Sequence, residues 1–145
     1  MGSIVSFRDL DAWNAAMELT VTTYGLCRRF PRDEQYGLVQ QMRRAAVSVP
    51  SNIAEGHANG PGLRYRNHVR IALGSLAELA TQLEIAVRLN YIDADTVKEA
   101  ATQLARARQL LHGLHRSLNR QLLTRPLTFV VLLGCAFAIA GLLSS

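Results

Sequence analysis

The sequence has little of what disulfide-stabilised and secreted proteins depend on. Only 2 of its 145 residues are cysteines, Cys27 and Cys135. One follows an amphipathic segment and the other lies in an apolar run, so neither a disulfide framework nor a zinc-ligand spacing is present. The first residues lack both a basic leader and an apolar stretch, which argues against a secretory signal peptide. We therefore expect a single domain in the reducing cytoplasm.

Residues for catalysis are equally scarce. His112 and His115 would share one helical face, but no Glu-x-x-His motif and no cysteine pair accompanies them. His57 and His68 flank a loop whose glycines are typical of a turn and not of a phosphate-binding loop. We expect a protein that is not an enzyme, with no catalytic residue, no metal and no cofactor.

The positive charge is carried almost wholly by arginine. The chain has 16 Lys and Arg against 11 Asp and Glu, a net charge of +5, and Lys98 is the one lysine. Arginine favours phosphate-facing and paired positions because its planar fork makes bidentate contacts. The alternative is a genome whose composition favours arginine codons, so the charge alone identifies no site.

Four segments show the apolar spacing of amphipathic helices, at about residues 8–29, 34–57, 63–90 and 93–122. Asp93 or Asp95 can cap the fourth, with Thr96 and Glu99 as a capping box. The expected inward-facing residues of the four segments are Leu10, Trp13, Met17, Val21 and Tyr24; Leu38, Met42, Ala45, Val49 and Ile53; Val69, Leu73, Leu76, Ala80, Leu83 and Val87; and Val97, Leu104, Ala107, Leu111, Leu114, Leu118 and Leu122.

The breaks between these segments are short. Phe30 and Pro31 end the first helix, Pro50 predicts a kink within the second, and residues 56–62 form a glycine-rich loop. Short connections between amphipathic helices make neighbours antiparallel. The sequence therefore predicts an all-α, up-down-up-down four-helix bundle over residues 1–124.

The last 20 residues differ in kind from the rest. Residues 126–145 carry no charge, and as a helix they would rise about 30 Å, the thickness of the hydrocarbon core of a bilayer. Arg116, Arg120 and Arg125 precede them, which by the positive-inside rule keeps the bundle cytoplasmic. We expect an extra apolar C-terminal helix over 125–145, a tail anchor spanning Leu127 to Leu143. The alternative is an apolar helix buried in an oligomer.

One polar string crosses the helical pattern. Arg44, Ser48, Asn52 and Glu55 recur at spacings that place them on one helical face. With Ser75 and Glu78 of the next helix they predict a structural polar network, in which Arg44 pairs with Glu55 or Glu78 and Gly74 lets the two helices approach. A ligand site is the alternative interpretation.

A basic set opens the third helix. Arg64, Arg66 and Arg70, with Arg43 from the second helix and Tyr65 between them, are candidates for nucleic-acid contact, because arginines can follow phosphates while a tyrosine stacks on a base. A solvated helix face is the alternative. A second set is attributed to helix amphipathicity and lipid headgroups: Arg106, Arg108, Arg116, Arg120 and Arg125.

Several runs together carry a resemblance to a known family. They are the residues Phe7 to Trp13, Tyr36 to Leu38, Arg43 to Ser48, Asn52 to Gly56 and Ala72 to Leu79. With them the chain resembles the four-helix-bundle family encoded by intervening sequences in bacterial 23S ribosomal RNA genes. The resemblance implies a homopentamer without catalytic residues. It also implies similarity to the accessory subunits of reverse transcriptases in diversity-generating retroelements, where a basic surface contacts nucleic acid.

Two functions follow as hypotheses. The first is a non-enzymatic oligomeric adaptor that binds RNA or a nucleic-acid enzyme such as a reverse transcriptase. The second is a membrane-anchored oligomeric scaffold or pore, whose bundle organises C-terminal transmembrane helices at the inner membrane.

Overall fold

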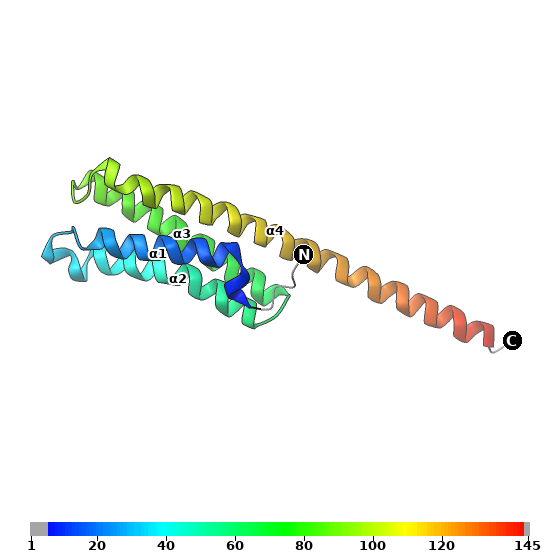
Figure 1. The fold of residues 1–145 in the computed structure, drawn as a ribbon. Helices are drawn as coiled ribbons and strands as arrows, with labels where there is room; N and C mark the ends of the chain where they lie inside the picture. The colour runs from blue at the N-terminus through cyan, green and yellow to red at the C-terminus, as the bar shows by residue number, and fades with distance from the viewer. Residues whose placement is uncertain (1–5, 144–145) are drawn as a thin grey trace.

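The computed structural model describes residues 6–143, and the side chains of residues 6–123. Its elements are two short 3₁₀ helices, η1 (Phe7–Asp9) and η2 (Arg32–Tyr36), and four α-helices, α1 (Asp11–Cys27), α2 (Leu38–Ala58), α3 (Leu63–Arg88) and α4 (Ala94–Leu143). The α-helices run up and down as an antiparallel bundle (Figure 1). The predicted all-α fold is therefore confirmed.

The connection between α1 and α2 is organised by one carboxylate. Glu34 Oε2 accepts a hydrogen bond from the backbone N–H of Leu38 at 2.9 Å, and so caps the start of α2. Its other oxygen, Oε1, accepts from the Tyr91 hydroxyl at 2.9 Å. A Cβ at Gly37 would lie 2.6 Å from Glu34 Oε2, so this carboxylate position requires glycine there. Glu34 thereby joins the two interhelical connections at one end of the bundle.

Pro50 lies inside the continuous helix α2. A proline has no N–H, so the carbonyl four residues earlier, that of Ala46, loses its intrahelical partner. The Thr20 hydroxyl of α1 lies 3.0 Å from this carbonyl oxygen and 2.8 Å from that of Ala16. The hydrogen bond that Pro50 removes is thus replaced by one that ties α2 to α1.

The other connections confirm the predicted turn chemistry in part. The loop between α2 and α3 is shorter than predicted, because α2 continues to Ala58, and α4 is capped by Asp93 and not by a capping box of Thr96 and Glu99. Gly60 adopts φ 73° between α2 and α3, a conformation that glycine reaches without steric cost. Asp93 caps α4, because its carboxylate accepts from Thr96 N at 2.7 Å and Thr96 Oγ1 at 2.8 Å. These hydrogen bonds lower the pKa of Asp93.

The core follows the predicted inner faces of α2, α3 and α4, but only the first part of that predicted for α1. The largest fully buried side chains include Met42 and Ile53 of α2, Leu76 and Leu79 of α3, and Leu111 of α4. The inner face of α1 consists mainly of small and aliphatic residues: Ala12, Ala15, Ala16, Leu19, Thr23, Leu26 and Cys27.

The predicted core stripe of α1 is confirmed only at its start, where Leu10 is buried and Trp13 packs against the core. Met17, Val21 and Tyr24 are 37%, 69% and 39% exposed. The alanines of α1 let it pack closely, and the larger apolar residues are left on a second face that turns outward. Helix α1 is therefore apolar on two faces, of which the bundle buries one.

The predicted extra C-terminal helix is instead the continuation of α4, which runs from Ala94 to Leu143 without a break. Figure 1 shows α4 extending past the other three helices. Across the residues whose side chains are described, no helix is long and apolar enough to cross a bilayer. The side chains of Leu127 to Leu143 lie outside that part, so the tail anchor stays a prediction.

Candidate functional site

The predicted polar network forms along the seam between α2 and α3. The hydroxyls of Ser48 and Ser75 lie 2.8 Å apart across the two helices. Asn52 Nδ2 donates to Ser48 O at 2.9 Å, and Asn52 Oδ1 lies 3.1 Å from His68 Nδ1. Because the amide oxygen can only accept, His68 Nδ1 carries the proton in this contact. The four side chains satisfy one another and hold the register of the two helices.

The charged members of the string lie at the exposed edge of this seam. Arg44 NH2 is 3.6 Å from Glu78 Oε1, and the two side chains are 70% and 44% exposed. Glu55 lies 3.6 Å from His68 and not beside Arg44. An exposed pair of this kind stabilises by about 0 to 1 kcal/mol, so the predicted Arg44–Glu78 pairing exists but is not a buried ion pair.

The two glycines near this seam, Gly56 and Gly74, have different surroundings. A Cβ at Gly56 would lie 2.5 Å from Tyr65 Cδ2, so the absence of a side chain admits the tyrosine ring. A Cβ at Gly74 would meet no atom within 4 Å. The prediction that Gly74 allows α2 and α3 to approach is therefore wrong.

The predicted nucleic-acid residues do not form one group. Tyr65 is 6% exposed, so its ring is not available to stack on a base. The Arg43 guanidinium lies over the Tyr24 ring of α1, 5.3 Å from its centroid. Arg64 and Arg66 are two residues apart, so their side chains lie about 160° apart around α3. Only Arg66 and Arg70, one helical turn apart, share a face.

This face of α3 borders a basic face of α4. Arg66 NH1 donates to Asn119 Oδ1 at 3.4 Å, which sets the start of α3 beside the middle of α4. Residues spaced three and four apart share the Asn119 side of α4. The α3/α4 basic face, as we name it, consists of Arg66, Arg70, Arg108, His112, His115 and Arg116.

Carboxylates are missing around the α3/α4 basic face. The sequence has no Asp or Glu at residues 56–77 or 100–145. Arg70, Arg108 and Arg116 are exposed, and within residues 6–123 none of them has an ion-pair partner. Arg106 does not belong to this face, because it lies 3.5 Å from Glu18 of α1. The face therefore presents charge that is free to meet an anion.

The fold combines basic residues that helical spacing assigns to separate sets. The arginines of α3 and those of α4 cannot be joined from spacing alone, because it does not show which helix faces are neighbours. The signal that was missed is the absence of acidic residues in both segments. Elsewhere, at the end where η2 meets the α3–α4 turn, carboxylates such as Asp33, Glu84 and Asp95 alternate with arginines.

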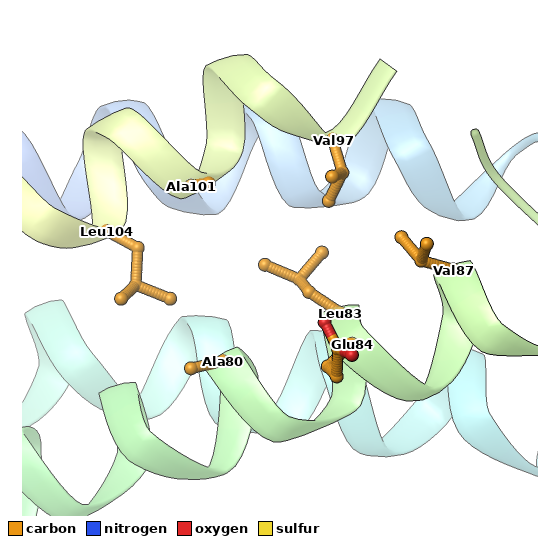
Figure 2. Close-up of a pocket in the computed structure, with 7 residues that line it drawn as sticks. All are labelled: Ala80, Leu83, Glu84, Val87, Val97, Ala101 and Leu104. Carbon is orange, nitrogen blue, oxygen red and sulfur yellow. The ribbon is translucent and has the colours of Figure 1, made fainter. Parts of the chain in front are cut away.

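A small apolar cavity lies between the C-terminal part of α3 and the N-terminal part of α4. It encloses about 160 Å³ and is lined by Ala80, Leu83, Glu84, Val87, Val97, Ala101 and Leu104. Figure 2 shows the aliphatic side chains of the two helices facing each other across it. Glu84, its one acidic group, already accepts a 2.7 Å hydrogen bond from Arg88 Nε. This arrangement offers no pair of groups for acid–base chemistry.

The described part of the chain contains no cluster of three or more residues that could hold a metal. Cys27 is fully buried, and this burial raises the pKa of its thiol, although the nearby Arg43 charge acts in the opposite direction. A buried, protonated thiol is a poor nucleophile.

Comparison with known proteins identifies the family. Residues 8–113 match the family described as 23S rRNA-intervening sequence protein. The chain belongs to this family. No curated protein sequence matches it.

A solved structure agrees with this assignment at the level of the fold. A protein with unknown function from the S23 ribosomal protein family of Bacteroides thetaiotaomicron is 22% identical, with a TM-score of 0.65. The similarity covers 72% of this chain and 97% of that one. The part of α4 beyond residue 113 lies outside the family match, and with it lie Arg116, Asn119 and the uncharged tail.

Proposed function

We propose that this 23S rRNA-intervening sequence protein is a non-enzymatic, oligomeric adaptor that binds RNA through the α3/α4 basic face. One observation carries the proposal: exposed arginines of two antiparallel helices share a face whose sequence segments contain no carboxylate. Arginine forks suit phosphate oxygens, and the attraction to a phosphate backbone does not depend on base sequence.

The geometry favours contact with the RNA backbone over recognition of bases. Tyr65 is buried, and the α3/α4 basic face contains no Phe, Tyr or Trp. The family description refers to 23S rRNA, which is consistent with an RNA partner or an enzyme that acts on RNA. If the partner is a protein such as a reverse transcriptase, the α3/α4 basic face would contact the nucleic acid bound to that enzyme.

The test compares two double variants of equal charge. Arg70→Ala with Arg116→Ala removes charge from the basic face. Arg28→Ala with Arg32→Ala removes the same charge from exposed positions at the opposite end. Binding of a short labelled single-stranded RNA is measured by fluorescence anisotropy against salt concentration.

We expect the first variant to weaken binding about tenfold or more and to lower the slope of log K against log salt by about 1.5, since two phosphate contacts are lost. The second variant should bind nearly as the wild type does. Equal losses in both variants would mean that net charge acts without a defined face. Absence of binding at physiological salt would reject the proposal.

The membrane-anchored scaffold remains a second candidate, favoured by a single observation. The backbone of α4 continues as a helix through the uncharged residues 126–143, past the end of the other helices (Figure 1). In that case the bundle would position the tails at the inner membrane.

A further inference from the structure

A second, larger cavity lies at the end of the bundle where α4 extends past the other helices (Figure 1). It has a volume of about 450 Å³, and pockets for small molecules generally measure about 300 to 1,000 Å³. Its walls come from Leu10 before α1, the end of α2, the turn after it, the start of α3, and the part of α4 from Leu114 to Gln121. None of the lining residues belongs to the α3/α4 basic face, so this cavity is a separate candidate site.

The lining of this cavity is apolar inside and polar toward solvent. Leu10 and Leu118 are 8% and 4% exposed, and Leu114 packs against the core. Ser117 is half-buried and Gln121 is exposed, so the amide of Gln121 lies at the mouth. The cavity therefore suits a molecule with an apolar body.

The one deeply buried polar residue of the lining is Tyr65, which is 6% exposed, and we name the site the Tyr65 cavity. The Tyr65 hydroxyl is buried and has no hydrogen-bond partner among the described residues. A phenylalanine would fill the same space without removing a hydroxyl from water. A buried polar group without a partner needs an explanation, and at the wall of a cavity a bound molecule that completes the hydrogen bond supplies one.

The chain fixes the tyrosine ring in this position. A Cβ at Gly56 would lie 2.5 Å from Tyr65 Cδ2, so the ring occupies space that a glycine in α2 leaves open. The His57 ring lies edge-on to the Tyr65 ring, with 6.1 Å between the two centroids and an interplanar angle of 84°. A hydroxyl that packing already holds in place loses little further freedom when a ligand binds, and this favours affinity.

The charge around the Tyr65 cavity favours an anionic ligand. Its described lining residues include no Asp or Glu, and residues 56–77 and 100–145 contain none. Asp9 and Asp11 flank Leu10 in the sequence, but both are exposed, and Asp9 already accepts from Ser6 N at 2.9 Å. An amine in the cavity would therefore meet no charged partner among the lining residues.

The protonation state of Tyr65 indicates which group of the ligand it binds. Burial raises the pKa of Tyr65 to about 12, so the phenol keeps its proton at neutral pH and acts as a donor to an acceptor oxygen. A hydrogen bond from a hydroxyl to a carboxylate is roughly twice as strong as one to a neutral acceptor. The half-buried His57 beside the same ring supplies a second polar group.

We infer that the Tyr65 cavity binds an apolar carboxylate, a carboxylic acid with an aliphatic or aromatic body. One carboxylate oxygen accepts from the Tyr65 hydroxyl, and the body lies against Leu10, Leu114 and Leu118. This site goes beyond the proposed RNA binding and shares no residue with it. Its α4 wall begins at Leu114, just past the residues that match the family.

Isothermal titration calorimetry of the full chain in a mild detergent tests the ligand class. The probe is 2-naphthoate, and its comparators keep the naphthyl body but carry a neutral amide, 2-naphthamide, or a cation, 2-naphthylmethylamine. Each titration is repeated into detergent buffer alone to subtract partition into micelles. We expect 2-naphthoate to bind, the amide to bind about tenfold more weakly, and the amine not to bind.

Variants then locate the binding site. Tyr65→Phe should weaken 2-naphthoate binding about tenfold or more, because the donor to the carboxylate is lost. Tyr36→Phe is the matched control, since Tyr36 is 91% exposed on η2, and it should bind as the wild type does. Ser117→Phe places a ring in the cavity and should abolish binding while the helical circular dichroism stays unchanged.

Three results would overturn the inference. Equal affinity of Tyr65→Phe and the wild type for 2-naphthoate would mean that the hydroxyl bonds only to water in the cavity. Equal affinity for all three probes would mean that apolar contact acts without recognition of the carboxylate. Absence of 2-naphthoate binding to the wild-type chain would leave the cavity without the proposed ligand.

Discussion

Tyr65 and Tyr91 show how differently two hydroxyls can be placed in one bundle. The Tyr91 hydroxyl donates to Glu34, the carboxylate that also caps α2. The Tyr65 hydroxyl is buried and has no hydrogen-bond partner among the described residues. A buried hydroxyl without a partner loses its bonds to water and gains nothing in return.

Removing the two hydroxyls should therefore have opposite consequences. We expect Tyr65→Phe to leave the free energy of unfolding within about 1 kcal/mol of the wild type, or to raise it, because no hydrogen bond is lost. Tyr91→Phe should lower the melting temperature, because it leaves Glu34 without its donor. Thermal unfolding followed by circular dichroism measures both. A large loss in Tyr65→Phe would indicate a hydrogen bond that the structure does not show.

The same variants respond differently to alkaline pH. Burial raises the pKa of Tyr65 to about 12, from about 10. Below pH 10 the phenol is protonated in both the folded and the unfolded state, so stability is unaffected. Between pH 10 and 12 only the unfolded state releases the proton, and the free energy of unfolding should fall by up to about 3 kcal/mol.

Urea unfolding at increasing pH measures this loss. Tyr65→Phe should show a shallower decline than the wild type. Some decline should remain, because the hydrogen bond to Glu34 also raises the pKa of Tyr91. Identical pH profiles for Tyr65→Phe and the wild type would contradict the assignment.

At the level of the helices, the link between Thr20 and Pro50 predicts a coupled pair of substitutions. Thr20→Val leaves the Ala46 carbonyl without a partner and should cost about 1 to 3 kcal/mol. Pro50→Ala restores an N–H that can bond to this carbonyl within α2. In the double variant the loss caused by Thr20→Val should be smaller than in the single one, and a double-mutant cycle measures the difference. Strict additivity would show that the carbonyl does not connect the two residues.

The existence and order of the four helices could be predicted from the sequence because apolar spacing, prolines and caps all agreed. For α2, α3 and α4 the large apolar residues mark the inner face, as with Met42 and Leu76. In α1 this rule failed, since Ala15 and Ala16 pack inward while Val21 and Tyr24 point out. Hydrophobic spacing identifies an apolar face, but it does not distinguish a face in the interior of the bundle from one on its surface.

The candidate site was predictable only in part, for a related reason. The sequence correctly predicted that four polar residues lie near one another: Ser48, Asn52, Ser75 and Glu78. Two antiparallel helices joined by a short loop bring residues at equal distances from the loop side by side. The α3/α4 basic face depends instead on the rotation of each helix about its axis. That rotation is set by packing around Arg66 and Asn119, which a single helical pattern does not contain.

For the whole molecule, the environment of α4 beyond the bundle decides between the adaptor and the membrane-anchored scaffold. We expect the full chain to sediment with membranes, and a chain that ends at Arg125 to stay in the soluble fraction, because residues 126–145 carry no charge. Cell fractionation followed by immunoblotting measures this. If both chains remain soluble as oligomers of the same kind, the tail is covered within the assembly and the scaffold hypothesis fails.

The uneven charge of the bundle also has a kinetic consequence. The α3/α4 basic face is uncompensated, whereas carboxylates and arginines are mixed at the other end. A polyanion approaching from a distance therefore exerts a torque that turns the basic face toward it before any contact forms. Added salt should then slow the rate of association more than it speeds dissociation, and the first encounter should already be oriented.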